Sequence, residues 1–344
     1  MVVLGADTHK RNHTVVAADE AGVELGSITV GATPEGHLRL VKWAARWPER
    51  RWALEDCRQL SRRLEADLLK LGELVVRVPP KMMAGVRRSA RTRGKSDPID
   101  ALAVARAALR EPDLPVAQLD GPSRELRLLV DYRESLVKDR TAAQNRLRWR
   151  LHELEPGYDP APGSLNRYKT LDEIDQLLAA HTSMVAVLGR REVVRIRELT
   201  REANQLERDI GQRVTQQVPR LLEIPGCGTL TAAKLVGEAA DISRFKSRDA
   251  YAMWAGVAPI PVWSANNQRF RLNRGGNRQT NAAIHRIAIT QLRIHPDAKA
   301  FIAHRLETGS TKREALRLLK RKLANVVYRT LLADTQQPAL ADAA

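Results

Sequence analysis

Four carboxylates in the first hundred residues are spaced so that they could bind divalent metal ions. Asp7 ends the apolar run VVLGAD, Glu55 ends the segment WALE, and Asp97 and Asp100 begin a helical segment. Asp97 and Asp100 are three residues apart, so they share one helix face. Four carboxylates can hold two Mg²⁺ ions that serve the attacking and leaving oxygens of a phosphodiester. Asp97 also qualifies as the N-cap of the helix, with Pro98 at its first position.

The elements that must position these acids follow an α/β order. Three β-rich segments separated by polar turns predict consecutive antiparallel strands, and helices then alternate with strands, as in an RNase H-like fold. Asp7 and Glu55 would end neighbouring strands. The expected strands span 2–7, 14–18, 24–30, 52–55 and 74–79, and the expected helices 34–47, 58–71 and 97–110.

Two long helical segments follow, at 123–154 and 170–218, with a Pro- and Gly-rich loop at 156–164. Apolar residues recur in the second at steps of three and four, which predicts an antiparallel coiled-coil-like hairpin. A dimer interface on this hairpin and a hairpin that packs only on itself are both open interpretations. The apolar stripe comprises Ile196, Leu199, Ala203, Leu206, Ile210, Val214 and Val218.

The segment LLEIPGCGTLTAAKLVGE after residue 220 predicts two helices around a glycine turn, a helix-hairpin-helix pattern. At Gly226, Gly228 and Thr229 the backbone could approach a phosphate closely and bind DNA without reading its sequence. An ordinary helix–helix turn is the alternative. Farther on, a basic helix over 311–332 begins with the capping-box pair Thr311 and Glu314, and about the last ten residues are expected to be disordered.

The net charge of +17 is concentrated at the C-terminal end, since residues 221–344 carry 19 Lys and Arg against 9 Asp and Glu. A clustered basic excess favours a nucleic-acid partner, although an Arg-rich soluble protein would share the composition. Two basic runs without acids precede Asp97 and follow residue 263, and they are the candidate phosphate contacts. They contain Lys81, Arg87, Arg88, Arg91, Arg93 and Lys95, and Arg269, Arg271, Arg274 and Arg278.

Two cysteines give no disulfide framework, and no apolar run reaches the roughly 20 residues of a membrane span. We therefore expect no membrane partner and a cytoplasmic, nucleoid-associated protein.

Two blocks of motifs resemble one family. GADTHK, ALEDC and KSDPIDA are similar to the DEDD signature of the IS110 family of insertion-sequence transposases, which includes related DNA invertases. IPGCGTLTAAKLV, RFKSRDAYAMWAGVAP and GGN resemble its C-terminal domain, so the resemblance spans about residues 2–332. It implies a RuvC-like domain over 1–118, a helical coiled-coil region over 119–220, a mainly helical transposase domain over 221–334 and a disordered tail over 335–344.

The resemblance also implies the roles of individual residues. Asp7, Glu55, Asp97 and Asp100 would be the catalytic metal ligands for two Mg²⁺ ions, and Ser264 would be the nucleophile. Ala265 stands where the family usually has glycine. The implied partners are donor and target DNA, a non-coding guide RNA encoded by the element, and further copies of the chain in a dimer or tetramer.

Two other functions are compatible with the same residues. A junction-resolving nuclease would use the four acids and would not need Ser264. A non-enzymatic nucleic-acid-binding protein would use neither, but four clustered carboxylates without a metal would repel DNA.

Overall fold

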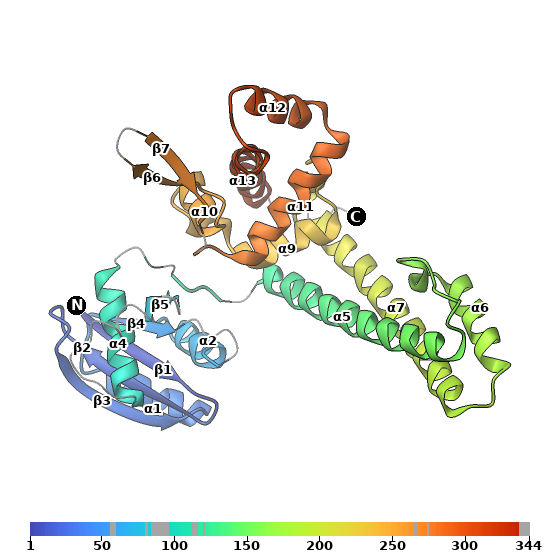
Figure 1. Cartoon of the computed structure of the whole chain (residues 1–344). Helices are drawn as coiled ribbons and strands as arrows, with labels where there is room; N and C mark the ends of the chain where they lie inside the picture. Colours follow the sequence, from blue (N-terminus) through green and yellow to red (C-terminus); the bar gives the residue numbers. More distant parts are fainter. Residues whose placement is uncertain are drawn as a thin grey trace, which may run out of the picture. The chain divides into compact units, whose positions relative to one another are not determined.

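The chain forms two compact units, Met1–Asp120 and Gly121–Ala344 (Figure 1). The division of the second unit into a connector and a transposase domain stays a prediction. The computed structural model describes residues 1–55, 60–79, 82–83, 96–111, 114, 116–119, 121–264, 267–273 and 275–336, and for 264 and 267–270 it describes the backbone alone.

The first unit is built on a five-stranded mixed sheet in the order β3-β2-β1-β4-β5. β1, β2 and β3 pair antiparallel, whereas β4 and β5 run parallel to β1. This is the RNase H-like strand order, so the predicted fold class is confirmed. The strands are β1 (Val2–Thr8), β2 (Asn12–Ala18), β3 (Glu24–Gly31), β4 (Arg50–Glu55) and β5 (Val75–Val78).

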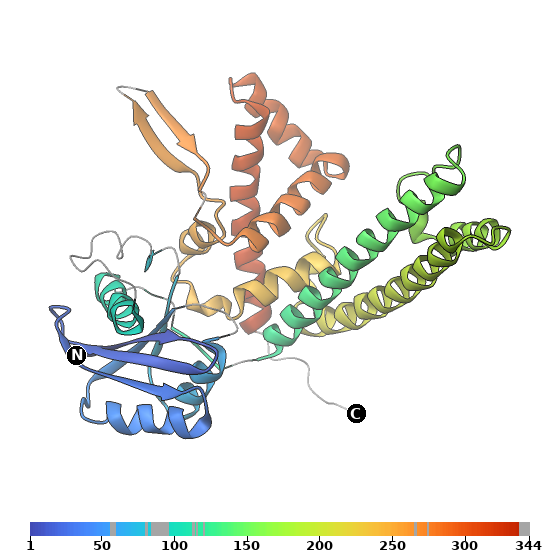
Figure 2. The ribbon, with the colours of Figure 1, turned by 60° about the horizontal axis from the view of Figure 1, so that its bottom comes forward.

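Helices cover both faces of this sheet (Figure 2). One core lies between the sheet and α4, and another lies against α1 and α2. Residues 56–59 are outside the described chain, and the helix expected over 58–71 is described from Arg62. The helices are α1 (Pro34–Ala44), α2 (Arg62–Lys70) and α4 (Asp97–Arg110).

A buried histidine pair lies between β2 and α1. The rings of His13 and His37 stack with centroids 5.2 Å apart, and both side chains are about 1% exposed. His37 Nδ1 is 2.6 Å from Asp67 Oδ2, whereas neither ring nitrogen of His13 has a hydrogen-bond partner within the described part of the chain. Burial, together with the nearby His37 and His9, lowers the pKa of His13 from 6.5 to about 4.

This pair makes the stability of the first unit depend on pH. The unfolded chain protonates His13 below pH 6.5, whereas the folded chain does so only near pH 4. The stability conferred by neutral His13 is therefore full above pH 6.5, and about 2 kcal/mol of it is lost by pH 5. Amide hydrogen exchange of β2 measures this loss. His13→Leu should lose less protection between pH 7 and pH 5 than the wild type, and an equal loss in both would contradict the prediction.

The second unit begins with the predicted antiparallel helical hairpin. Ion pairs between α5 and α7 join Arg146 to Glu192 at 2.7 Å and Arg133 to Glu207 at 2.5 Å. The earlier residue of α5 pairs with the later residue of α7, so the two helices run antiparallel. The stretch predicted as one helix over 170–218 is interrupted, because the Ser183 side chain caps a new helix by accepting from the Ala186 N–H. The elements are α5 (Pro122–Leu154), the 3₁₀ turn η1 (Ser164–Asn166), α6 (Tyr168–Ala179) and α7 (Met184–Gln217).

The predicted apolar stripe of α7 faces its neighbours. All of its members are buried except Leu206, which is half-buried. Burial of this stripe supplies the stability that long helices lack in isolation.

The remaining helices pack around one apolar core with α5 and α7. A β-hairpin that the sequence analysis did not predict leaves this core. The capping box is confirmed, since the Thr311 N–H donates to Glu314 at 2.9 Å and the Glu314 N–H donates to Thr311 at 3.3 Å. These elements are α8 (Pro219–Leu222), α9 (Thr229–Ala239), η2 (Ile242–Arg244), α10 (Arg248–Trp254), β6 (Ile260–Ser264), β7 (Asn267–Arg271), α11 (Arg278–Ile294), α12 (Pro296–Glu307) and α13 (Lys312–Gln336).

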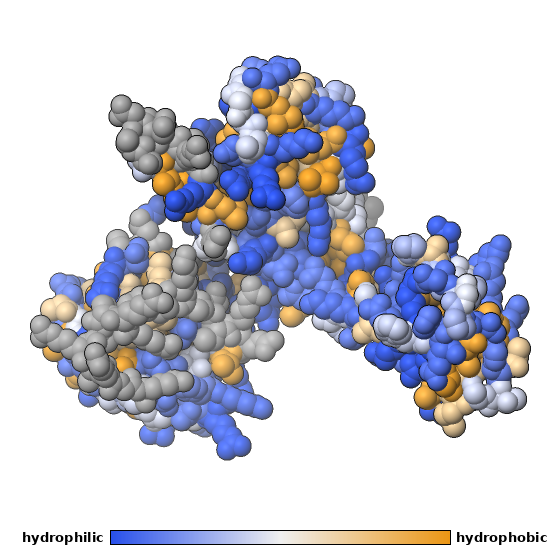
Figure 3. All heavy atoms as spheres, viewed as in Figure 1, coloured by the Kyte–Doolittle hydropathy of each residue, from blue (hydrophilic) through white to orange (hydrophobic). Residues whose placement is uncertain are grey.

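The C-terminal helix is longer than predicted. α13 runs to Gln336, two residues into the segment expected to be disordered, because Leu331 still packs on the core one turn earlier. Residues 337–344 are outside the described chain. Hydrophilic residues cover most of the visible surface, with hydrophobic patches among them (Figure 3). Within the described residues, no helix combines the length and apolar character of a membrane span.

Candidate active site

Three side chains meet at the end of β1. His9 Nε2 lies 3.1 Å from Asp7 Oδ2 and 3.5 Å from Asp97 Oδ1. One ligand atom from each residue fits within a mutual distance of 4.8 Å, which is compatible with a divalent metal site. The structure therefore brings Asp7 and Asp97 together although ninety residues separate them.

Asp100 belongs to the same acidic group. It is 8% exposed, and so is Asp7. Burial raises the pKa of Asp7, and repulsion from Asp100 and Asp97 adds to the shift, while His9 opposes it. A site that disfavours the charge of its own carboxylate gains from a cation.

Glu55 is the neighbour of Asp7 in the sheet. β4 lies beside β1 with Leu54 next to Ala6, so the following residues, Glu55 and Asp7, stand side by side. Leu54 and Ala6 both point into the core under α1 and α2. Because strand residues alternate between faces, Glu55 and Asp7 project from the opposite face, toward α4.

Asp97 is not the N-cap of α4. Ser96 occupies the N-cap position, and Asp97 is the first helical residue. The sequence-based capping role is therefore wrong by one position. The Asp97 carboxylate lies toward His9 instead.

Two residues of this site were missed by sequence reasoning. His9 follows Asp7 by two positions, and the alternation of a strand puts both on one face, which is the signal that could have found it. Gly5 was the other, because its contacts are not local. A Cβ on Gly5 would lie 2.2 Å from the Ala101 carbonyl oxygen and 2.4 Å from the Ala105 nitrogen. Only glycine lets α4 cross β1 this closely, and that crossing places the first turn of α4 beside Asp7.

The predicted nucleophile lies in the second unit. Ser264 is the last residue of β6 and pairs with Asn267 at the far end of the β6–β7 hairpin. Its side chain is outside the described part of the structure, so its nucleophilic role stays a prediction.

Close backbone contact fixes the base of this hairpin. A Cβ on Gly276 would lie 2.2 Å from Gly256 Cα, and Gly256 has a φ of +68°. Asn281 Nδ2 donates to the Gly256 carbonyl oxygen at 2.8 Å, and Asn277 Nδ2 donates to Glu238 at 2.6 Å. The GGN motif at 275–277 therefore anchors the hairpin to α9 and α11.

The predicted helix-hairpin-helix differs in one element, since α8 is a single turn of four residues. Gly226 has a φ of +83° and faces α11, where a Cβ would lie 3.0 Å from Thr290 Cβ. Close packing against α11 is therefore sufficient to explain why residue 226 is a glycine. Gly228 and Thr229, at the start of α9, stay candidate phosphate contacts; a Cβ on Gly228 would meet no atom of the described residues within 4 Å.

The basic candidates are only partly described. Arg271 and Arg278 are both exposed. The remainder lie outside the described residues or, for Arg269, in the described backbone without its side chain: Lys81, Arg87, Arg88, Arg91, Arg93, Lys95, Arg269 and Arg274.

Comparison with known sequences identifies the family. Residues 4–156 match the DEDD transposase model of IS110 type, described as a transposase, and residues 218–303 match the transposases of the IS116/IS110/IS902 family. The chain belongs to the IS110 family of transposases. The four acids lie in the first matched segment and Ser264 lies in the second.

Relatives of this transposase extend over nearly its full length. It is 26% identical to the 44.8 kDa protein of insertion element IS116 from Streptomyces clavuligerus, covering 95% of this chain and 94% of that protein. It is 24% identical to the 42 kDa protein of insertion element IS900 from Mycobacterium paratuberculosis, covering 96% and 95%.

Among solved structures, Thermus thermophilus RuvC in complex with a Holliday junction substrate aligns at 18% identity and a TM-score of 0.26, over 33% of this chain and 95% of RuvC. The RNase H-like fold of the transposase is assigned from its strand order and not from this alignment.

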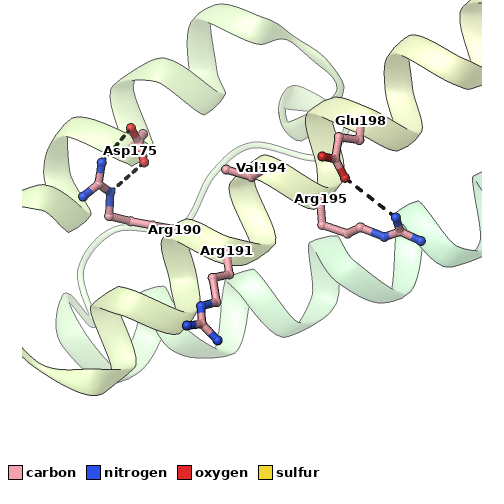
Figure 4. Close-up of a pocket in the computed structure, with 6 residues that line it drawn as sticks. All are labelled: Asp175, Arg190, Arg191, Val194, Arg195 and Glu198. Carbon is pink, nitrogen blue, oxygen red and sulfur yellow. Dashed lines mark hydrogen bonds and ion pairs between the residues drawn. The ribbon is translucent and has the colours of Figure 1, made fainter.

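A charged hollow on the helical hairpin of the transposase is not a comparable site (Figure 4). Arg190 pairs with Asp175 at 2.9 Å, and Arg195 pairs with Glu198 at 3.7 Å. Both acids are therefore neutralised by arginines of the same surface. The hollow is lined by Asp175, Arg190, Arg191, Val194, Arg195 and Glu198.

Gly5→Ala tests whether the α4 crossing positions the acids. The added methyl group collides with helix backbone, so we expect a loss of about 1–3 kcal/mol or more in stability of the first unit. The first turn of α4 should also move away from Asp7. Gly31→Ala is the control, because its Cβ would meet nothing closer than 3.8 Å. Thermal unfolding with and without Mg²⁺ measures both effects. If Gly5→Ala kept wild-type stability and Mg²⁺ stabilisation, α4 would not depend on this contact.

Proposed function

We propose that this transposase cuts and rejoins DNA strands with two Mg²⁺ ions and a serine nucleophile, guided by a non-coding RNA of its own element. The convergence of Asp7, Asp97 and His9 within 4.8 Å is the observation that carries the proposal. Asp100 is near enough to raise the pKa of Asp7, and a divalent cation would relieve that repulsion.

The donor set fits a hard cation. Carboxylate oxygens are the protein ligands that Mg²⁺ prefers, and Asp7, Glu55, Asp97 and Asp100 would hold the ions. Bound there, Mg²⁺ would stabilise the negative charge that develops on a phosphodiester and its leaving oxygen. Burial of Asp7 and Asp100 keeps these carboxylates from turning away, so the ligands are oriented before substrate arrives.

Ser264 would perform the covalent step. Its Oγ loses its proton and forms a bond to phosphorus, while the bond from phosphorus to the 3′ oxygen breaks. The 3′ oxygen takes up a proton and leaves as a hydroxyl. Attack of a 3′-hydroxyl on the phosphoserine reverses the step and rejoins a strand, so no external energy source is needed. A serine hydroxyl is a weak nucleophile unless a base or a metal activates it.

The excess of basic residues supports both proposed nucleic-acid partners, DNA and RNA. Residues 221–344 carry 19 basic against 9 acidic side chains, which suits DNA backbone contacts and an RNA cargo. In an RNA-guided system the protein contacts the nucleic-acid backbone and recognises its shape, and base pairing with the guide RNA selects the sequence. Self-association into a dimer or tetramer is part of the proposal, because Leu128 and Val194 are more than half exposed on the helical hairpin.

A recombination assay tests the whole proposal. Full-length protein is incubated with two DNA duplexes, one carrying the element's flanking sequence, with and without its non-coding transcript. Joined product should form only when Mg²⁺ and the transcript are both present. Equal joining in EDTA would remove the metal from the mechanism, and equal joining without the transcript would remove the guide.

A further inference from the structure

The base of the β6–β7 hairpin gathers three basic side chains around a narrow hollow. Arg271 comes from the end of β7, whereas Arg317 and Lys320 come from consecutive turns of α13. The opposite wall is formed by the segment 256–259. Among the described residues that line this hollow there is no acid, in contrast to the charged hollow on the helical hairpin.

Lys320 is the unusual member because it is only 8% exposed. Its Nζ donates to Asn281 Oδ1, a neutral partner. Among the described residues, neither Lys320 nor Arg317 lies within 4 Å of a carboxylate oxygen. Burial lowers the pKa of Lys320, and Arg317 lowers it further. A buried cation without a counter-ion is costly, so this position gains from an anion.

The size of the hollow limits what can bind. Its volume is about 10 Å³, close to that of one water-sized sphere. An oxygen atom of an anion fits inside it, but a base or a sugar does not. Gly256, at a φ of +68° and in contact with Gly276, contributes only backbone to the wall. An anionic oxygen can therefore approach without meeting a side chain there.

We propose that Arg271, Arg317 and Lys320 bind one backbone phosphate of the nucleic acid on which the transposase acts. This inference rests on the proposed function and adds a defined anchor to it. An arginine can hold two phosphate oxygens at once, and the buried lysine adds a compact positive charge. Such a contact fixes position and carries no sequence information.

The hairpin register sets the distance from this anchor to the proposed nucleophile. Arg271 pairs with Ile260, and Ser264 ends the same strand four residues later. At about 3.4 Å per residue, the two positions lie roughly 14 Å apart along the hairpin. The anchored phosphate is therefore not the one that Ser264 would attack. It lies farther along the strand and would hold that strand in register.

The test compares Lys320→Met with wild type in full-length protein. Binding is measured by fluorescence anisotropy, from about 50 to 200 mM KCl, with a duplex of the element's flanking sequence in one arm and its non-coding transcript in the other. Loss of one phosphate contact should reduce the slope of log affinity against log salt by about 0.7–0.9 and weaken binding on the order of tenfold. Lys299→Met removes the same charge from an exposed position of α12 and should change the slope less.

Each outcome is decisive. A reduced slope in the DNA arm alone assigns the phosphate to DNA, and a reduced slope in the transcript arm alone assigns it to RNA. A wild-type slope in both arms overturns the proposal. If wild type binds neither nucleic acid, the proposed function fails, and the anchor fails with it. Lys320→Met should not lower the melting temperature, because it removes a buried charge. If it nevertheless fails to fold, the half-buried Arg317→Met carries the same comparison.

Discussion

Asp7→Asn is expected to abolish DNA strand cleavage while leaving the fold intact. Asn keeps the shape of the side chain but loses the charge that a metal ion requires. Metal-ion catalysis supplies several kcal/mol, and each 1.36 kcal/mol is a factor of ten, so the rate should fall by about 10³-fold or more. Since burial and neighbouring acids raise the pKa of Asp7, removing its charge should not reduce the free energy of unfolding.

The measurement is the initial rate of cleavage of a labelled duplex in Mg²⁺, with transcript present. Glu24→Gln makes the same chemical change at an exposed position of β3 and should cleave at the wild-type rate. A second readout is independent of activity. Mg²⁺ should raise the melting temperature of the wild type and of Glu24→Gln, and it should raise that of Asp7→Asn by a smaller amount. Wild-type cleavage by Asp7→Asn would falsify the acidic site.

Ser264→Ala is expected to abolish strand exchange and the covalent protein–DNA product, while nucleic-acid binding survives. Removing the nucleophile of a covalent mechanism leaves no group to form the phosphoserine, so we expect a loss on the order of 10³-fold or more. The adduct is measured by denaturing electrophoresis of labelled DNA after a short reaction. Ser310→Ala, in the loop before α13, is the matched control and should form the adduct normally.

The same pair of variants separates the competing functions. A junction-resolving nuclease would lose cleavage in Asp7→Asn but retain it in Ser264→Ala, with no adduct in wild type. A non-enzymatic binding protein would show no cleavage to lose. If Ser264→Ala recombines at the wild-type rate with an adduct still present, another residue is the nucleophile.

Local patterns predicted much of the first unit. Apolar runs with polar turns between them specify short strands, and Asp7 and Glu55 were placed at strand ends because the runs stop there. The helix over 97–110 was predicted with the bounds that the structure has, but its N-cap is Ser96 and not Asp97, since both are good N-cap types. The break between α6 and α7 was missed, because Ser183 was a single capping residue inside a helical pattern.

The β6–β7 hairpin shows where local signals fail. Its segments IPVWS and NQRFR are only five residues each, and the second is mostly polar. Short strands of this kind gain their stability from partners far along the chain, here the contact of Gly256 with Gly276. Gly256 and Gly276 are farther apart than the roughly 11–18 residues over which a periodic pattern is read.

Sequence patterns alone were enough to name the candidate residues: four acids in a fixed order, with the strands and the helix that carry them, and a serine in a basic segment whose strand was not predicted. The crossing of α4 over β1 at Gly5, which sets Asp97 beside Asp7 and His9, is visible in the folded chain and not in any local pattern. The physical reason is that strand and helix patterns arise from neighbouring residues, whereas a helix crossing is selected by close packing between segments about a hundred residues apart.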